Sequence, residues 1–92
     1  MVDSFVRRLP ALSRVAPGYV VVCAPDGTCL EMGGSAAAIW QALPGPDEPP
    51  AAFHALVGEL AAAHGVEPEV AARDVDAAIR AWEAVGCVAR RA

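Results

Sequence analysis

Three cysteines and two histidines are the side chains in this sequence that could ligate a metal ion or act in covalent catalysis. Zinc sites usually take their ligands from closely spaced pairs such as C-x-x-C or H-x-x-x-H, and no such pair occurs here. His54 and His64 are ten residues apart on one expected helix, almost three turns, so they cannot share an ion. We expect no metal and no cofactor at these residues, which are Cys23, Cys29, Cys87, His54 and His64.

Covalent catalysis needs a nucleophile with a base beside it, and the sequence offers little of either. Cys29 has no histidine near it along the chain. Gly33-Gly34-Ser35 could hold an anion at a helix start, but it lacks the lysine of a phosphate-binding loop, and a helix cap explains it more simply. We therefore expect that the protein is not an enzyme.

The length and charge of the chain narrow the classes of partner. With 92 residues it forms one domain, and its formal net charge of −4 argues against nucleic-acid binding, which needs a basic surface. No apolar run approaches the roughly 18 residues that cross a bilayer, and Met1–Pro10 lacks the apolar core of a signal peptide. We expect a soluble, cytoplasmic protein without a membrane partner, its cysteines free thiols rather than a disulfide framework.

Strand-like patterns in the first third of the chain predict three strands, at about 11–15, 19–24 and 28–32. Pro25-Asp26-Gly27 predicts a three-residue hairpin loop that places Cys23 opposite Cys29. A disulfide between them is conceivable in that register, although a reducing cytosol disfavours it. A two-residue loop would put the cysteines on opposite faces, and we favour the first register because it keeps Glu31 out of the core. The core face then carries Val20, Val22, Leu30 and Met32.

Helical spacing begins after Gly33-Gly34, and the sequence indicates no further strand. Ser35 is the expected N-cap of a first helix at 36–43. Two amphipathic helices follow, at about Pro50–His64 and Pro68–Val85. We expect residues 1–10 to form a flexible arm and residues 89–92 a solvated tail, around one domain at 11–88.

The second and third helices also suit a DNA-binding helix-turn-helix with a wing. Acidic residues outnumber Arg73 and Arg80 on the third helix, however, and a negative recognition helix repels DNA. Those acidic residues are Glu69, Asp74, Asp76 and Glu83. A small winged-helix DNA-binding regulator is the alternative function, and a structural subunit without a peptide ligand is a further one.

The strand at 28–32 is the last of the predicted sheet, so it forms an edge if the strand order follows the chain. An unpaired edge invites another strand. The simpler interpretation is that the third helix covers this edge. The alternative is a groove between the edge and that helix, which takes up an extended peptide.

Several motifs together carry a family resemblance. They are the strand–turn–helix stretch Leu30–Leu43 with Ile39-Trp40, the segment from Leu60 through Gly65-Val66-Glu67-Pro68-Glu69-Val70, the pair Asp74-Val75 and the closing Gly86-Cys87-Val88. In this combination, over roughly Pro17–Val88, the chain resembles the PqqD-like family. These are the recognition-element or peptide-chaperone domains of pathways that modify ribosomally made peptides.

The resemblance implies an α+β, winged helix-turn-helix-like fold, a three-stranded antiparallel sheet followed by three helices. It also implies that the leader segment of a precursor peptide adds as a strand beside the third strand, against the third helix. Its further partner would be a maturation enzyme, namely a protease, a cyclase or a radical SAM enzyme. The lasso-peptide, radical-enzyme and pyrroloquinoline quinone pathways all stay open.

Carried over by position, the resemblance implies a groove with two walls. The strand contributes Thr28, Cys29, Leu30, Glu31 and Met32. The third helix contributes the flank Ala72, Asp76, Ile79, Arg80 and Glu83, although the sequence leaves open which flank of this helix faces the strand.

Overall fold

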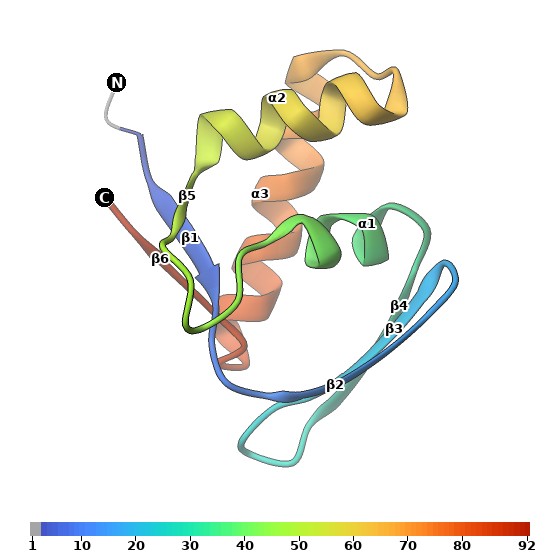
Figure 1. Ribbon diagram of the computed structural model, residues 1–92, viewed down its shortest axis with the longest axis vertical. Helices are drawn as coiled ribbons and strands as arrows, with labels where there is room; N and C mark the ends of the chain where they lie inside the picture. Colours follow the sequence, from blue (N-terminus) through green and yellow to red (C-terminus); the bar gives the residue numbers. More distant parts are fainter. Residues whose placement is uncertain (1–2) are drawn as a thin grey trace.

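The computed structural model describes residues 3–92 and changes from strands to helices at Gly33 (Figure 1). Its architecture is α+β, with a three-stranded antiparallel sheet and three helices, as predicted. The winged helix-turn-helix description stays a prediction. The elements are β1 Phe5–Arg8, β2 Leu12–Ala16, β3 Tyr19–Cys23, β4 Cys29–Gly33, α1 Gly34–Ala42, β5 Ala51–Ala52, α2 Phe53–His64, α3 Pro68–Ala84 and β6 Val88–Arg91.

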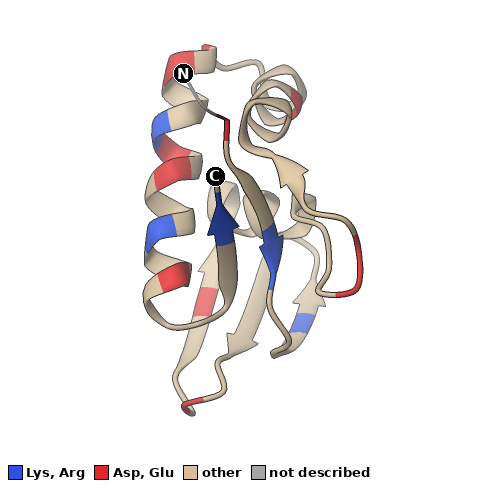
Figure 2. Ribbon diagram, turned by 90° about the vertical axis from the view of Figure 1, so that its left-hand side faces the viewer, with Lys and Arg blue, Asp and Glu red and all other residues tan. Residues whose placement is uncertain are grey.

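A second sheet, with the order β5-β1-β6, joins the two ends of the chain. β1 runs antiparallel to β6 and places Phe5 opposite Arg91 and Arg8 opposite Val88. Val6 is completely buried and Val88 is 3% exposed, so both strands contribute to the core. Figure 2 shows β6 lying between α3 and β1.

This second sheet corrects three expectations drawn from the sequence. Residues 5–8 are not a flexible arm, residues 89–91 of the expected tail belong to a strand, and strands do occur after Ser35. Residues 1 and 2 of the expected arm lie outside the described residues. The strands were missed because each has at most four residues, too few to show alternation, and because their partners lie at the other end of the chain.

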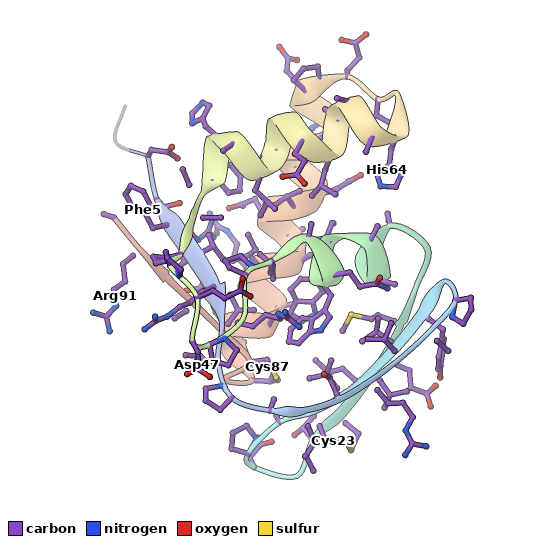
Figure 3. All side chains as sticks on the ribbon, in the orientation of Figure 1. Phe5, Cys23, Asp47, His64, Cys87 and Arg91 are labelled. Atoms are coloured by element: carbon purple, nitrogen blue, oxygen red, sulfur yellow. A yellow bond between two sulfur atoms is a disulfide. The ribbon has the colours of Figure 1, made fainter. Side chains whose placement is uncertain are left out.

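The sheet β2-β3-β4 has the predicted strand order and the predicted register. β3 and β4 place Cys23 opposite Cys29 and Val20 opposite Met32. The two cysteines form a disulfide, drawn in Figure 3, whereas Cys87 is free and buried. The expectation of free thiols is therefore wrong for this pair, because the register places the two sulfur atoms directly across the hairpin.

The loop that joins β3 to β4 is the predicted three-residue connection. The Ala24 N–H donates to the Thr28 carbonyl at 2.7 Å, and the Gly27 N–H donates to the Ala24 carbonyl at 3.0 Å. Gly27 has φ +92°, a conformation that side chains disfavour, so glycine is required here. The Asp26 carboxylate accepts the Thr28 N–H at 2.9 Å, which completes the loop.

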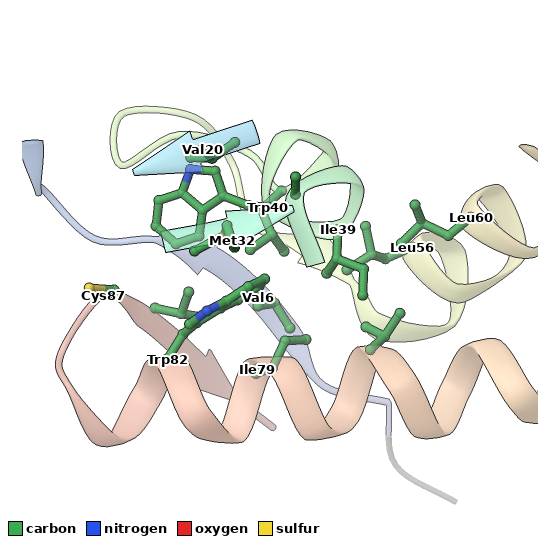
Figure 4. Close-up of a cluster of buried hydrophobic side chains, with 14 of the residues drawn as sticks. Val6, Val20, Met32, Ile39, Trp40, Leu56, Leu60, Ile79, Trp82 and Cys87 are labelled. Carbon is green, nitrogen blue, oxygen red and sulfur yellow. The ribbon is translucent and has the colours of Figure 1, made fainter. Parts of the chain in front are cut away.

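Two tryptophans join the helices to the sheet in the core (Figure 4). The rings of Trp40 from α1 and Trp82 from α3 meet edge to face, with centroids 5.3 Å apart and planes at 87°. Val20 of β3 lies above Trp40 and Met32 of β4 lies between the two tryptophans in this view, and both are buried. The sheet therefore rests on α1 and α3 through its predicted core face.

The helices begin and end near their predicted limits, with one cap misassigned. Gly33, not Ser35, is the N-cap of α1, and no side chain caps this end. Gly34 has φ +56°, so the glycine pair turns the chain directly from β4 into the helix and leaves Ser35 inside its first turn. Gly65 closes α2 in the left-handed conformation, as predicted.

No helix within residues 3–92 combines the length and the apolar character needed to cross a membrane.

Candidate peptide-binding edge

β4 is an edge strand whose single neighbour in the sheet is β3. Opposite residues of two antiparallel strands alternate between pairs that are hydrogen-bonded to each other and pairs that are not. Ala24 and Thr28 form a bonded pair, so every second pair along β3 and β4 from that point is also bonded. Leu30 and Met32 therefore direct their main-chain groups to β3. Cys29 and Glu31 direct theirs away from β3, toward the outer side of the edge. This side offers two N–H and C=O pairs to a further strand.

The five strand residues predicted for the groove divide by orientation. Met32 is buried and Leu30 half-buried against the core, while the side chains of Cys29 and Glu31 lie on the exposed face of the sheet. Thr28 is exposed at the end of the hairpin loop, where its N–H bonds Asp26. Outward-facing main-chain groups, rather than side chains, are thus what this strand presents at the edge of the sheet.

The exposed face beside this edge carries a polar pair. Partial desolvation raises the pKa of the Tyr19 hydroxyl above its ordinary value, and its hydrogen bond with Glu31 raises it further. Tyr19 is opposite Gly33, and Glu31 is two residues from Gly33 along β4, so the side chains of Tyr19 and Glu31 lie on the same face of the sheet. Glu31 therefore places a carboxylate on the exposed face beside β4.

The flank of α3 predicted for the groove instead faces β6. The Arg90 guanidinium donates to the Asp76 carboxylate at 2.8 Å and lies 3.5 Å from the Glu83 carboxylate. Arg80 also donates to Asp76, at 2.8 Å, one helical turn away. The contacts of Arg90 join Asp76 and Glu83 to the second sheet, whereas the bond between Arg80 and Asp76 lies within α3.

The remaining two predicted helix residues belong to the core rather than to an open groove. Ile79 is completely buried, and Ala72 is half-buried against the core cluster. The sequence could not assign the flank, because β6 and therefore Arg90 were missing from the predicted fold.

The opposite flank of α3 carries small side chains that sequence reasoning missed. At 100° per residue, Asp74, Ala78, Ala81 and Val85 lie on the other side of the buried stripe from Asp76. Ala78 and Val85 pack partly against the core, and Ala81 is exposed. The signal present in the sequence was the pair of alanines at 78 and 81, three residues apart on this flank. Figure 4 shows β4 above the Trp82 end of this helix.

A small cavity of about 70 Å³ lies between the start of α1, the end of α2 and the first half of α3. Ser35, His64 and Asp74 are its polar lining residues, and no hydrogen bond joins any two of them among the described residues. This arrangement therefore lacks the bonded nucleophile and base that covalent catalysis uses. The cavity places Asp74 of α3 near Ser35, in the first turn of the helix that follows β4.

Comparison with known proteins identifies the family. Residues 18–88 match the family model described as Coenzyme PQQ synthesis protein D (PqqD). A search of curated proteins and a search of solved structures each found no match. The matched residues run from the turn before β3 to the start of β6 and include all three helices. The chain belongs to the PqqD family.

Proposed function

We propose that this protein binds the leader segment of a ribosomally synthesised precursor peptide and presents that peptide to a modifying enzyme, without catalysing a reaction itself. The observation that carries the proposal is the outer side of β4, where Cys29 and Glu31 offer main-chain hydrogen bonds in a member of the PqqD family. An extended peptide that adds to such an edge gains affinity from main-chain bonds, largely independent of its sequence.

Specificity would then come from the side chains on the two faces of the added strand. Alternate leader residues would point toward α3, where the small side chains of Ala78 and Ala81 leave room for apolar groups. The other leader residues would point to the exposed face beside Glu31. A basic or neutral leader fits this carboxylate and the net charge of −4.

The second partner would be the enzyme that modifies the precursor, a protease, a cyclase or a radical SAM enzyme. The proposal covers lasso-peptide, radical-enzyme and pyrroloquinoline quinone pathways alike. Two parts of the proposal rest on membership of the PqqD family: that the partner is a peptide, and that one protein binds this peptide while a separate enzyme modifies it.

A pair of proline variants tests the edge. Glu31→Pro removes an outward N–H of β4 without touching a bond to β3, and proline is tolerated at such edge positions. Ser13→Pro is the matched control, because Ser13 lies opposite Val22 at a non-bonded position of β2, the other edge of the same sheet.

The ligand is the leader of a short precursor encoded beside this protein, titrated by calorimetry and by backbone amide shifts. We expect micromolar binding, shifts centred on residues 29–33 and α3, and at least about tenfold weaker binding for Glu31→Pro alone. Equal binding by both variants would reject the edge as the site. Absence of binding by the unaltered chain would reject the function.

A further inference from the structure

An open cleft of about 900 Å³ lies where three segments of the chain meet. The segments are the β1–β2 connection, the β3–β4 hairpin and the region of α1 and the loop that follows it. Arg8 is the only charged residue in the lining. The lining residues are Arg8, Leu9, Pro10, Ala11, Leu12, Ser13, Cys23, Ala24, Pro25, Gly27, Cys29, Trp40 and Pro46.

Arg8 is a half-buried cation without a carboxylate partner. No carboxylate of the described residues lies within 4.0 Å of its guanidinium nitrogens, and its buried Nε donates no hydrogen bond. Glu48 accepts the Gly45 N–H at 2.7 Å, and its carboxylate lies on the same side of Gly45 as the Arg8 guanidinium without reaching ion-pair distance. A guanidinium in this setting is expected to find an anion.

Trp40 also lines this cleft, and it carries a buried donor without an acceptor. Its indole Nε1 is buried and has no hydrogen-bond partner among the described residues, in a side chain that is only 2% exposed. The Arg8 guanidinium stacks over this indole, with Cζ 5.6 Å from the ring centroid. Stacking fixes the plane of the guanidinium and leaves its edge available for a carboxylate.

We propose that this cleft binds an acidic peptide segment of a partner protein, an aspartate or glutamate flanked by apolar residues. The carboxylate would accept hydrogen bonds from Arg8 in the two-pronged geometry that arginine provides, and a small rotation of the rings would bring the Trp40 N–H within reach. Leu9, Leu12 and the lining prolines would contact the flanking side chains. Charge selects an anion here, because the lining contains no acidic residue.

The proposal extends beyond leader binding, since it rests on the side chains of Arg8 and Trp40 and not on Glu31 or the small-residue flank of α3, although Cys29 of β4 also borders the cleft. The test therefore needs no leader peptide. It uses the full chain labelled with nitrogen-15, in which the indole N–H of Trp40 and the Nε–H of Arg8 report directly on the two donors. Trp82 is the only other tryptophan in the sequence, so Trp40→Phe assigns the indole signal.

Two capped tripeptides serve as probes, acetyl-Leu-Asp-Leu-amide and its uncharged match acetyl-Leu-Asn-Leu-amide. We expect saturable shifts of both reporter signals with the aspartate peptide at millimolar concentrations, and at least about fivefold weaker binding of the asparagine peptide. Equal binding of the two peptides, or no saturable shift with either, would overturn the proposal.

Two variants separate Arg8 from general charge effects. Arg8→Gln should abolish the preference for the aspartate peptide, whereas Arg14→Gln, on the exposed strand β2, should retain it. If Arg8→Gln fails to fold, Arg8→Lys keeps the charge without the two-pronged geometry and should weaken the preference. An unchanged preference in a folded Arg8 variant would contradict the proposal.

Discussion

Asp76 of α3 and Arg90 of β6 bind each other through a hydrogen bond of 2.8 Å between Oδ1 and Nη1. The Arg90 side chain is 18% exposed, so this ion pair is partly shielded from water. It attaches one flank of α3 to the second sheet. The other flank, with Ala78 and Ala81, is thereby left for the side of the molecule where β4 lies.

The first prediction concerns the acid stability that this pair provides. The hydrogen bond from Arg90, aided by Arg80, lowers the pKa of the Asp76 carboxyl below its ordinary value of 3.8, although burial opposes the shift. A lowered folded-state pKa stabilises the fold above the ordinary value, and this contribution disappears as the pH falls through the folded-state pKa. Asp76→Asn should therefore destabilise the protein by about 1 kcal/mol near neutral pH, and by much less near about pH 2.

Urea unfolding at both pH values measures this difference. Asp74→Asn is the matched control, because it removes the same charge from the same helix at a residue for which no ion pair is found among the described residues. The control should change stability little at either pH. If Asp76→Asn lowered the unfolding free energy by the same amount at both pH values, the electrostatic role of Asp76 would be contradicted.

The second prediction tests which flank of α3 faces the leader. Ala81→Leu adds bulk to the exposed small-residue flank and should weaken leader binding by at least about tenfold, because it fills the space beside β4. Ala77→Leu makes the same change at an exposed position on the outer side of the helix and should leave binding unchanged. Calorimetric titration with the leader compares the two.

Helical content by circular dichroism should be the same for both variants. Arg80→Gln, on the flank that faces β6, should also bind the leader normally. Weakened binding by Arg80→Gln with normal binding by Ala81→Leu would return the site to the flank predicted from the sequence.

The third prediction concerns the Cys23–Cys29 disulfide, which closes a short loop across the hairpin. Closing a loop of this length stabilises a fold by about 2 kcal/mol in the chain-entropy model. A dithiol reductant should lower the unfolding free energy of the native chain by about this amount. The double variant Cys23→Ser, Cys29→Ser should have the lower stability from the start and should not respond to the reductant.

Alkylation followed by mass spectrometry checks the assignment of the thiols. Burial raises the pKa of the Cys87 thiol, and the Asp26 carboxylate adds to the effect, so Cys87 should react slowly in the folded protein and fully in denaturant. Under non-reducing conditions the denatured chain should take up one label. Three labels under those conditions would show that Cys23 and Cys29 are not bonded.

The hairpin could be predicted from the sequence because its determinants are local. Pro25, Asp26 and Gly27 fix the loop, and the loop fixes every pair from Cys23–Cys29 onward. The edge position of β4 follows from the same information. The outward orientation of the main-chain groups of Cys29 and Glu31 was thus predictable from the hairpin alone.

The flank of α3 could not be predicted, because it depends on a contact between distant parts of the chain. Asp76 and Arg90 are fourteen residues apart, and Arg90 lies on a four-residue strand whose partner is β1 at the other end of the chain. Nothing in the pattern around Arg90 indicates a strand. The charged flank of α3 was therefore interpreted as a ligand surface, without the contacts that Asp76 and Glu83 make with Arg90 of β6.

The pairing of β1 with β6 also determines how the module can be tethered. Because Phe5 lies opposite Arg91, a linker attached at either end of the domain emerges from the same place, at the β5-β1-β6 sheet rather than at the β2-β3-β4 sheet (Figure 1). A fusion to an enzyme at the amino end or at the carboxyl end would leave the outer side of β4 uncovered. The same domain can thus be joined to another chain in either order.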